Sequence, residues 1–434
     1  MLTLSDDKFT AIVIGGGPSG STAAYVLAKE GLDVLLIEKG DTSGSKNMFG
    51  GRMYSHALNR IIPGFWEEAP VERAVTKEII TFLTEDKSVS VICQNDNWAK
   101  EPYHSFTLLR AEFDRWLASK AEEAGAIVAT SIKVDDLIIE NNKVVGIKAG
   151  EDEMYADVII AADGVNSLMA QKAGLRKDLE PKQVATGIKQ IIKLSKEKIN
   201  DRFQVTDSYG VAQLFVGHCT KGLHGGGFLY TNKDTISIGL VINISALRHN
   251  TIRLVDLLED FKNHPSIAPI IEDGEVEEYS AHLVPEAGIN MKPQLIGEGF
   301  LVVGDAAGFV LNLGFLVRGM DFAIASGEAA AKAVIEAKKS NDFSKSALLA
   351  YERYLKQSFV MQHLEIYRKA PHFLENERLY GKYPALAANL LTKMFTVDGG
   401  QPRRLFGTAM NEIKMSGLSL AKLAMDGWKG MRSL

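Results

Sequence analysis

Two apolar stretches at the start of the chain flank a glycine-rich turn. Residues 9–14 are almost all apolar, residues 15–20 read G-G-G-P-S-G, and residues 10–38 as a whole have strand–helix–strand spacing. A short, continuous apolar strand is typical of a sheet that is buried on both faces. The pattern therefore predicts a βαβ unit at the N-terminus.

The spacing of apolar residues predicts further elements along the chain. They are a helix at 108–125, a hairpin at 127–147 that turns at residues 141 and 142, a buried strand at 156–164, strands with glycine turns at 183–245, and a helix at 254–264. Strand spacing returns near residue 295, and the chain after residue 343 reads as helices and loops.

These elements predict an α/β protein in which one domain interrupts another. We expect residues 1–182 and 295–342 to form one domain around a parallel sheet. Residues 183–294 are expected to form an inserted antiparallel β-sheet domain, and residues 343–434 a helical C-terminal segment.

The composition narrows the classes of function. The 434 residues are 46% apolar and 24% charged, with a net charge of −5, which gives no reason to expect a nucleic acid partner. The two cysteines, Cys93 and Cys219, are too few for an iron–sulfur cluster, which needs about four, and the histidines have no spacing typical of a metal site. We therefore expect no metal, and a reducing, cytoplasmic compartment.

The C-terminal segment is basic. Residues 343–434 hold 14 Lys and Arg against 7 Asp and Glu, and Ile413, Leu420, Leu423 and Trp428 fall close to one helical face. No apolar run approaches the roughly 20 residues of a spanning helix, so any membrane contact is expected to be peripheral. A partner subunit or a solvated helix face explains the basic charge equally well.

The first glycine turn has the features of a dinucleotide fingerprint. Gly15 allows a tight turn, Gly17 lets backbone amides approach a pyrophosphate, and Gly20 permits close packing of helix on strand. The helix that begins at Pro18 and Ser19 directs its positive end at the phosphates. Glu38 ends the second strand 18 residues after Gly20, where a carboxylate accepts ribose hydroxyls.

A second glycine turn identifies the dinucleotide. Residues 299–308 form a strand followed by G-D-A-A-G, which resembles the distal motif of the glutathione-reductase-type FAD flavoproteins. The resemblance implies that Asp305, after Gly304, binds the ribityl chain, although an aspartate here also suits a helix N-cap. The two turns together predict one FAD, extended between them.

Several segments resemble a more specific family. Residues 44–54, G-S-K-N-M-F-G-G-R-M-Y, are similar to a motif of the FixC branch of the electron-transfer-flavoprotein:quinone oxidoreductases. Residues 225–230, 264–267, 371–376 and 395–399 resemble further segments of that family. The resemblance covers nearly the whole chain.

The family resemblance implies a pathway and partners. It implies that the flavin accepts electrons from the α and β subunits of an electron-transfer flavoprotein and reduces a membrane quinone, at the inner face of the cell membrane. A separate small ferredoxin-like protein is expected, and in some organisms the complex bifurcates electrons from NADH to ferredoxin and quinone. Composition does not distinguish simple electron transfer to the quinone from electron bifurcation.

The resemblance also implies site residues. Lys39, Gly51, Arg52, Arg110 and Asp163 are expected beside the FAD, with a surface arginine and a chain turn as the plainer roles of the last two. At the position of Arg318, Gly319 and Met320, relatives place glycines against the flavin edge. This chain has an arginine there, and Arg318 either adds a cation beside the flavin or is solvated.

A quinone pocket is expected at a third glycine run. Gly226 and Gly227 give either a thin wall or a plain β-turn, and Phe228 and Tyr230 offer an apolar lining. The rival functions are a geranylgeranyl-reductase-like enzyme, a single-component flavin hydroxylase, and a scaffold that uses FAD structurally.

Overall fold

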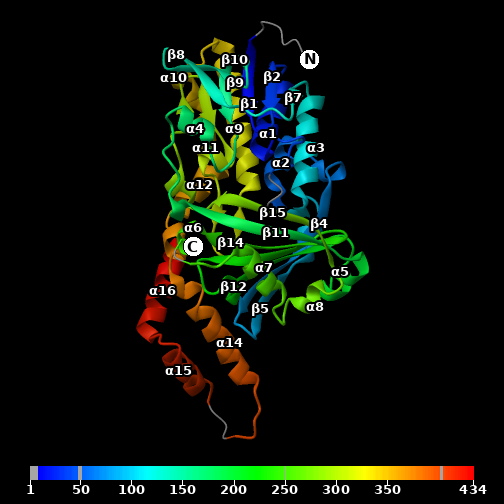
Figure 1. Ribbon diagram of the computed structural model, residues 1–434, viewed down its shortest axis with the longest axis vertical. Helices are drawn as coiled ribbons and strands as arrows, with labels where there is room; N and C mark the ends of the chain where they lie inside the picture. The colour runs from blue at the N-terminus through cyan, green and yellow to red at the C-terminus, as the bar shows by residue number, and fades with distance from the viewer. Residues whose placement is uncertain (1–7, 47–50, 249, 401–403) are drawn as a thin grey trace.

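The computed structural model describes residues 8–46, 51–248, 250–400 and 404–434. Figure 1 shows three parts along the long axis: a sheet flanked by helices, a large second sheet, and a helical segment that projects at the far end. Asn47, Met48, Phe49 and Gly50 of the family motif, and Arg403 of the basic tail, lie outside the described residues.

The first sheet is centred on β1 (Phe9–Ile14). Its order is β16-β17-β10-β1-β2-β7, and β1 pairs in parallel with both β2 and β10. The other strands are β2 (Val34–Ile37), β7 (Ile127–Ala129), β10 (Asp152–Ala161), β16 (Ile296–Gly297) and β17 (Phe300–Val302). Residues 11–14 and all of β2 are buried, as the continuous apolar runs predict.

The hairpin is shorter than predicted. It consists of β8 (Asp136–Glu140) and β9 (Lys143–Ala149), and its turn at Asn141 and Asn142 has positive φ values of 49° and 65°. The residues at 127–129 instead form β7, which pairs in parallel with β2. Since β2 otherwise has a free edge, the apolar stretch there adds to the sheet rather than to the hairpin.

Helices α1 (Pro18–Lys29), α3 (Arg110–Glu123) and α9 (Met320–Ser340) pack beside this sheet. A Cβ on Gly327 would overlap the carbonyl oxygen of Ser19, so α9 approaches α1 more closely than an alanine permits. The segment after residue 295 thus packs directly on the N-terminal segment, as expected for one domain formed from both.

The second sheet has nine strands in the order β15-β11-β14-β13-β12-β4-β6-β3, with β5 on β4. The strands predicted at 183–245 are β11 (Val184–Lys193), β12 (Tyr209–Gly217), β13 (Gly225–Thr231) and β14 (Thr235–Asn243). A further strand, β15 (Glu275–Pro285), lies within the expected inserted domain but was not predicted. Four more come from residues 52–108: β3 (Arg52–Tyr54), β4 (Val71–Leu83), β5 (Ser88–Gln94) and β6 (Ser105–Leu108). The boundary expected at residue 182 therefore does not separate the two sheets.

This sheet is not antiparallel throughout. β12 and β4 pair in parallel and join the early strands to the later ones. Helix α7 (Leu254–Lys262) buries Leu257, Leu258 and Phe261 in the apolar core of the sheet.

The remaining elements are short connections and the C-terminal helices. They are α2 (His56–Ile61), α4 (Leu168–Lys172), α5 (Lys196–Phe203), α6 (Ile244–Leu247), α8 (Ala268–Ile271), β18 (Leu311–Asn312), β19 (Val317–Arg318), α10 (Lys345–Leu348), α11 (Ala350–Gln357), α12 (Phe359–Ile366), α13 (Ala370–Leu374), α14 (Lys382–Phe395), α15 (Leu405–Met415) and α16 (Leu420–Ser433). Of the described helices, none has both the length and the apolar composition needed to cross a membrane.

Candidate functional site

The two glycine turns lie against each other, although about 290 residues separate them. A Cβ on Gly304 would lie 2.5 Å from Ser19 Oγ, and the Gly304 amide donates a 2.9 Å hydrogen bond to Ser326 Oγ in α9. The first turn at the start of α1 and the second turn, in the 3₁₀ segment at Gly304–Ala307, therefore border the same region.

The geometry of the first turn requires its glycines. Gly15 has a φ of 108°, and side chains on Gly15 or Gly20 would overlap backbone carbonyl oxygens. No described atom lies within 4 Å of a Cβ built on Gly17, the N-cap residue of α1. Pro18 and Ser19 begin this helix, so its positive end faces open space suited to an anion.

Glu38 is held firmly at the end of β2. One carboxylate oxygen accepts a 2.8 Å hydrogen bond from the Gly16 amide, and the other accepts a 2.7 Å hydrogen bond from the Gly40 amide. Each oxygen keeps a second lone pair. The carboxylate is thus held in a fixed orientation, and it can still accept hydrogen bonds from hydroxyl groups.

Cationic side chains gather near the second turn. Arg110 is 9% exposed and forms a two-point ion pair with Asp114, with distances of 2.9 and 2.7 Å, and it lies in electrostatic range of Asp305. It is therefore no surface arginine. Two basic residues near Arg110 were missed by the sequence analysis, Lys189 in β11 and His282 in β15. Both lie close enough that, besides burial, the charge of Arg110 lowers their pKa values.

Burial controls the protonation of this cluster. Burial, with the charges of Arg110 and Lys39, lowers the pKa of His282 to about 4, and burial also lowers the pKa of Lys189. The Lys189 ammonium is 1% exposed and lies 3.5 Å from Glu278 Oε1. Burial thus disfavours the charged forms of His282 and Lys189, and the Arg110 guanidinium, which keeps its charge beside Asp114, is the group best suited to an anion such as a pyrophosphate.

Asp163 turns the chain at the end of β10. Its Oδ2 accepts a 2.9 Å hydrogen bond from the Met169 amide in α4, and burial raises its pKa. Its Oδ1 is buried and has no hydrogen-bond partner among the described residues. The plainer role is therefore present, and one oxygen remains for a ligand.

Gly51 and Arg52 lie at the second sheet. Gly51 abuts the ring of Tyr230, and Arg52 makes two hydrogen bonds with Glu78, one of them 2.9 Å long. The Arg52 guanidinium also lies 4.5 Å from the centre of the Tyr54 ring. Strand β3 thus connects the second sheet with the residues that follow the first βαβ unit.

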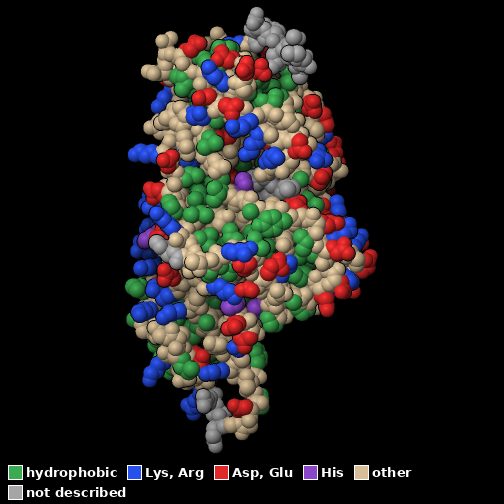
Figure 2. Space-filling view, in the orientation of Figure 1, with side chains coloured by type: hydrophobic (Ala, Val, Ile, Leu, Met, Phe, Trp, Pro, Cys, Tyr) green, Lys and Arg blue, Asp and Glu red, His purple; other side chains and the backbone are tan. Residues whose placement is uncertain are grey.

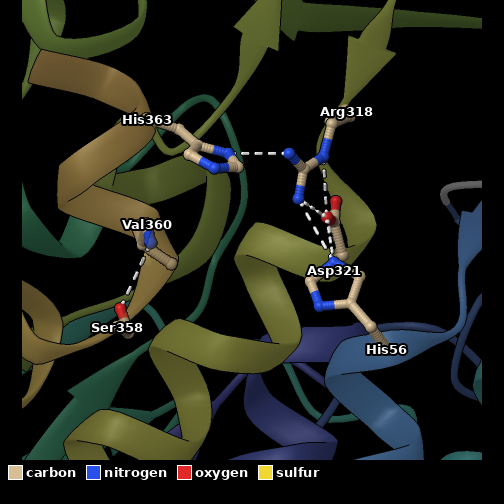
Figure 3. A network of polar contacts seen from close by, with 6 residues as sticks. All are labelled: His56, Arg318, Asp321, Ser358, Val360 and His363. Atoms are coloured by element: carbon tan, nitrogen blue, oxygen red, sulfur yellow. Dashed lines mark hydrogen bonds and ion pairs between the residues drawn. The ribbon is translucent and has the colours of Figure 1, made fainter. Parts of the chain in front are cut away.

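Arg318 is neither solvated nor free. Its side chain is 10% exposed, and Figure 3 shows it bonded to Asp321 in α9 and to His363 in α12. Arg318 Nε lies 2.9 Å from Asp321 Oδ2, and another guanidinium nitrogen lies 2.7 Å from His363 Nδ1. Gly319 is the N-cap residue of α9, and Met320 is its first residue.

The predicted quinone residues lie on both faces of β13. Phe228 and Tyr230 stack with ring centres 5.3 Å apart, on the face where Tyr230 abuts Gly51. Gly226 shares that face by strand alternation. Gly227 points the other way, towards the ring of Phe261 in α7.

The residues at the two glycine turns are suited to bind FAD. The open space at Gly17, the oriented carboxylate of Glu38 and the buried guanidinium of Arg110 match a phosphate-bearing dinucleotide. Among the described residues, no group of three or more His, Cys, Asp or Glu side chains could hold a metal ion.

Comparisons with known proteins agree with this assignment. Residues 11–186 match the model of the FAD dependent oxidoreductase family, and residues 370–434 match the ETF-QO/FixC family C-terminal domain. The chain is 50% identical to the probable electron transfer flavoprotein-quinone oxidoreductase YdiS of Escherichia coli, over 99% of this chain and 100% of that protein. It is 47% identical to protein FixC of the same bacterium over the same shares.

A solved structure shares the fold. The geranylgeranyl bacteriochlorophyll reductase-like protein of Thermoplasma acidophilum superimposes with a TM-score of 0.72 at 25% identity, over 94% of this chain and 96% of that one. Near-complete coverage at about half identity is far stronger evidence of kinship than this shared fold. The chain therefore belongs to the FixC and electron-transfer-flavoprotein–quinone oxidoreductase family, and it is an FAD-dependent oxidoreductase.

Proposed function

We propose that this chain takes electrons from the two subunits of an electron-transfer flavoprotein and passes them through its FAD to a membrane quinone. The observation that carries the proposal is the full-length similarity to an oxidoreductase of that name. In this proposal, Gly17, Ser19 and Arg110 face the pyrophosphate, Glu38 the adenosine ribose, and Asp305 the ribityl chain. The start of α9, at Gly319 and Met320, faces the flavin ring.

The quinone is proposed to approach along the face of the second sheet that carries Phe228 and Tyr230. These stacked rings are adjacent to Gly51, next to the segment that follows the first βαβ unit. Aromatic faces suit a planar quinone headgroup. Gly226 leaves room beside them, and the backbone of Gly227 completes the wall.

The chain is proposed to work as a subunit of a complex. It has one dinucleotide fingerprint, and its two cysteines are fewer than the roughly four that a cluster needs. A small ferredoxin-like protein would supply the cluster, and electrons would enter the flavin from the electron-transfer flavoprotein.

Reconstitution tests this route. The purified chain with FAD should reduce a quinone analogue negligibly from NADH, and addition of the electron-transfer flavoprotein and the ferredoxin-like protein should restore turnover. NADH-dependent turnover by the single chain would contradict the proposal and favour a self-sufficient reductase or hydroxylase. Reduction of ferredoxin together with quinone in the same assay would show bifurcation, whereas reduction of quinone alone would show linear transfer.

Membrane docking is proposed for the projecting end of the C-terminal segment. Met394, Phe395, Val397, Leu405 and Phe406 are exposed there, with 81% of Phe395 and 95% of Val397 accessible. We call these five residues the apolar tip. Figure 1 shows that α14 and α15 carry this tip away from the two sheets.

Basic residues accompany the apolar tip. Residues 399–434 hold two acidic residues, Glu412 and Asp426. Both are buried in ion pairs, Glu412 with Lys393 and Asp426 with Arg378, so they do not offset the exposed cations of this stretch. Figure 2 shows Lys and Arg side chains along the edge of the molecule beside α16. Apolar residues beside cations suit an anionic lipid surface.

One expectation about the tail is wrong. Ile413 lies in α15, whereas Leu420, Leu423 and Trp428 lie in α16, so the four residues do not form one helical face. The break falls where Gly417 adopts a φ of 70°, which ends the first helix.

A further inference from the structure

The first turn of α9 belongs to a closed network of four polar side chains, drawn in Figure 3. Arg318 and Asp321 form its centre, and Asp321 is 1% exposed. His363 closes the network from α12, and His56 closes it from the first residue of α2. Of the four, only His56 has a well-exposed side chain, at 50%. His56 is therefore the member of the network most open to water.

His56 has two alternative partners for a single atom. Its Nε2 lies 3.1 Å from Asp321 Oδ2 and 3.2 Å from a guanidinium nitrogen of Arg318. A ring nitrogen without a proton can only accept, which selects Arg318, and a protonated one can only donate, which selects Asp321. The geometry thus accommodates Nε2 without a proton, in one neutral tautomer, and with a proton, in the other neutral tautomer or in the cationic ring.

His363 does not share this ambiguity. Its Nδ1 lies 2.7 Å from the Arg318 guanidinium, which has only protons to offer, so Nδ1 must accept. Burial, followed by the charge of Arg318, lowers the pKa of His363. His363 therefore stays neutral and holds the arginine, while His56 can change its charge.

The charges around His56 nearly balance. Arg318 and Asp321 cancel, and Glu328 in α9 pairs with both Arg60 in α2 and Lys332 in α9. His104, Arg52 and Glu78 are the further titratable or charged groups on the side of the second sheet, and Arg52 is paired with Glu78. Burial and the charge of Arg52 lower the pKa of His104. Protonation of His56 therefore adds one positive charge to a cluster in which the other charged groups are paired.

We propose that His56 is a positioning residue that binds a proton when the FAD is reduced, and so compensates the negative charge of the reduced flavin through Asp321 and Arg318. The inference rests on the proposed function in one respect, the location of the flavin ring at the start of α9. Bound FAD would take up two electrons from the reductant and one proton, which would leave one negative charge, and a second proton, taken from water, would bind at His56 Nε2. His56 then exchanges its contact with Arg318 for one with Asp321.

The pH dependence of the flavin potential tests this inference. For a two-electron couple, each proton taken up shifts the potential by about 30 mV per pH unit. We expect the wild-type holoprotein, titrated with a chemical reductant and redox mediators, to approach the two-proton slope of about 59 mV per unit within the range where histidine titrates. His56→Gln should follow the one-proton slope of about 30 mV per unit throughout.

A control variant separates His56 from other histidines. His372→Gln removes an exposed ring that lies 3.0 Å from Glu375 in another part of the fold. It should keep the wild-type slope. A wild-type slope in His56→Gln, or a one-proton slope in the wild type across this pH range, would overturn the inference.

The titration is independent of the partner proteins. It uses neither the electron-transfer flavoprotein nor a quinone, so a failed reconstitution leaves its result intact. Conversely, quinone reduction with an unchanged slope in His56→Gln would support the proposed function and refute the role of His56. The absorbance of bound FAD in each variant shows whether the cofactor is retained.

Discussion

Glu38 orients the loop around the first glycine turn and also presents a carboxylate to the ribose. We expect Glu38→Ala to weaken FAD binding by about 1–3 kcal/mol, the usual effect of losing a hydrogen bond to a charged group. Titration of the apoprotein with FAD, followed by flavin fluorescence, measures this. Glu30→Ala, an exposed residue just after α1, should leave the affinity unchanged. Equal affinities in the two variants would remove Glu38 from the ribose site.

His282 makes the apoprotein sensitive to acid. Its pKa is about 4 in the folded chain and about 6.5 when unfolded, so between these values only the unfolded state binds the proton. Its contribution to stability is therefore lost as the pH falls from about 6.5 towards 4. Urea unfolding of the apoprotein at pH 7 and pH 5 should show wild type losing roughly 1–2 kcal/mol more than His282→Gln. Parallel losses in both proteins would contradict the assignment.

At the scale of secondary structure, α1 and α9 pack so closely that Gly327 has no room for a side chain. Gly327→Ala places a methyl group onto the backbone of Ser19, so α9 must shift and the second glycine turn moves with it. We expect a destabilisation of about 1–3 kcal/mol and loss of FAD during gel filtration. Gly427→Ala in α16 is the matched control, because no described atom lies within 4 Å of the added methyl group. It should stabilise the helix by up to about 1 kcal/mol.

The sequence was most informative where an element depends on its own residues. The turn at Gly15, the helix α3 and the hairpin turn at Asn141 are properties of local spacing and backbone conformation. The membership of β3 to β6 in the second sheet was missed because a strand pattern does not name its partner. Lys189 and His282 were missed for the same reason, since only the pairing of β11 with β15 brings them near Arg110.

Arg318 shows the limit for single site residues. Its position before α9 was readable from the sequence, but its two histidine neighbours come from residues 56 and 363. No spacing rule connects positions that are so far apart along the chain. The FAD motifs were readable because the cofactor is bound mainly by turns and helix ends, which have sequence signatures of their own.

At the scale of the whole molecule, the apolar tip predicts how the protein meets a membrane. Phe395→Ser with Phe406→Ser should reduce flotation with anionic liposomes severalfold, because two exposed aromatic side chains no longer enter the lipid. Val91→Ser with Ile92→Ser, which changes two exposed apolar side chains of β5, is the control and should float like wild type. Equal flotation of wild type and the tip variant would assign the tip to a partner subunit instead.

The contact of Ser19 with Gly304 and Gly327 also has a consequence for biosynthesis. Residues 9–37 leave the ribosome early, yet the surfaces that complete their site belong to residues beyond 300. Between these events, all nine strands of the second sheet are synthesised. The complete FAD site therefore forms late, after roughly three quarters of the chain has been synthesised.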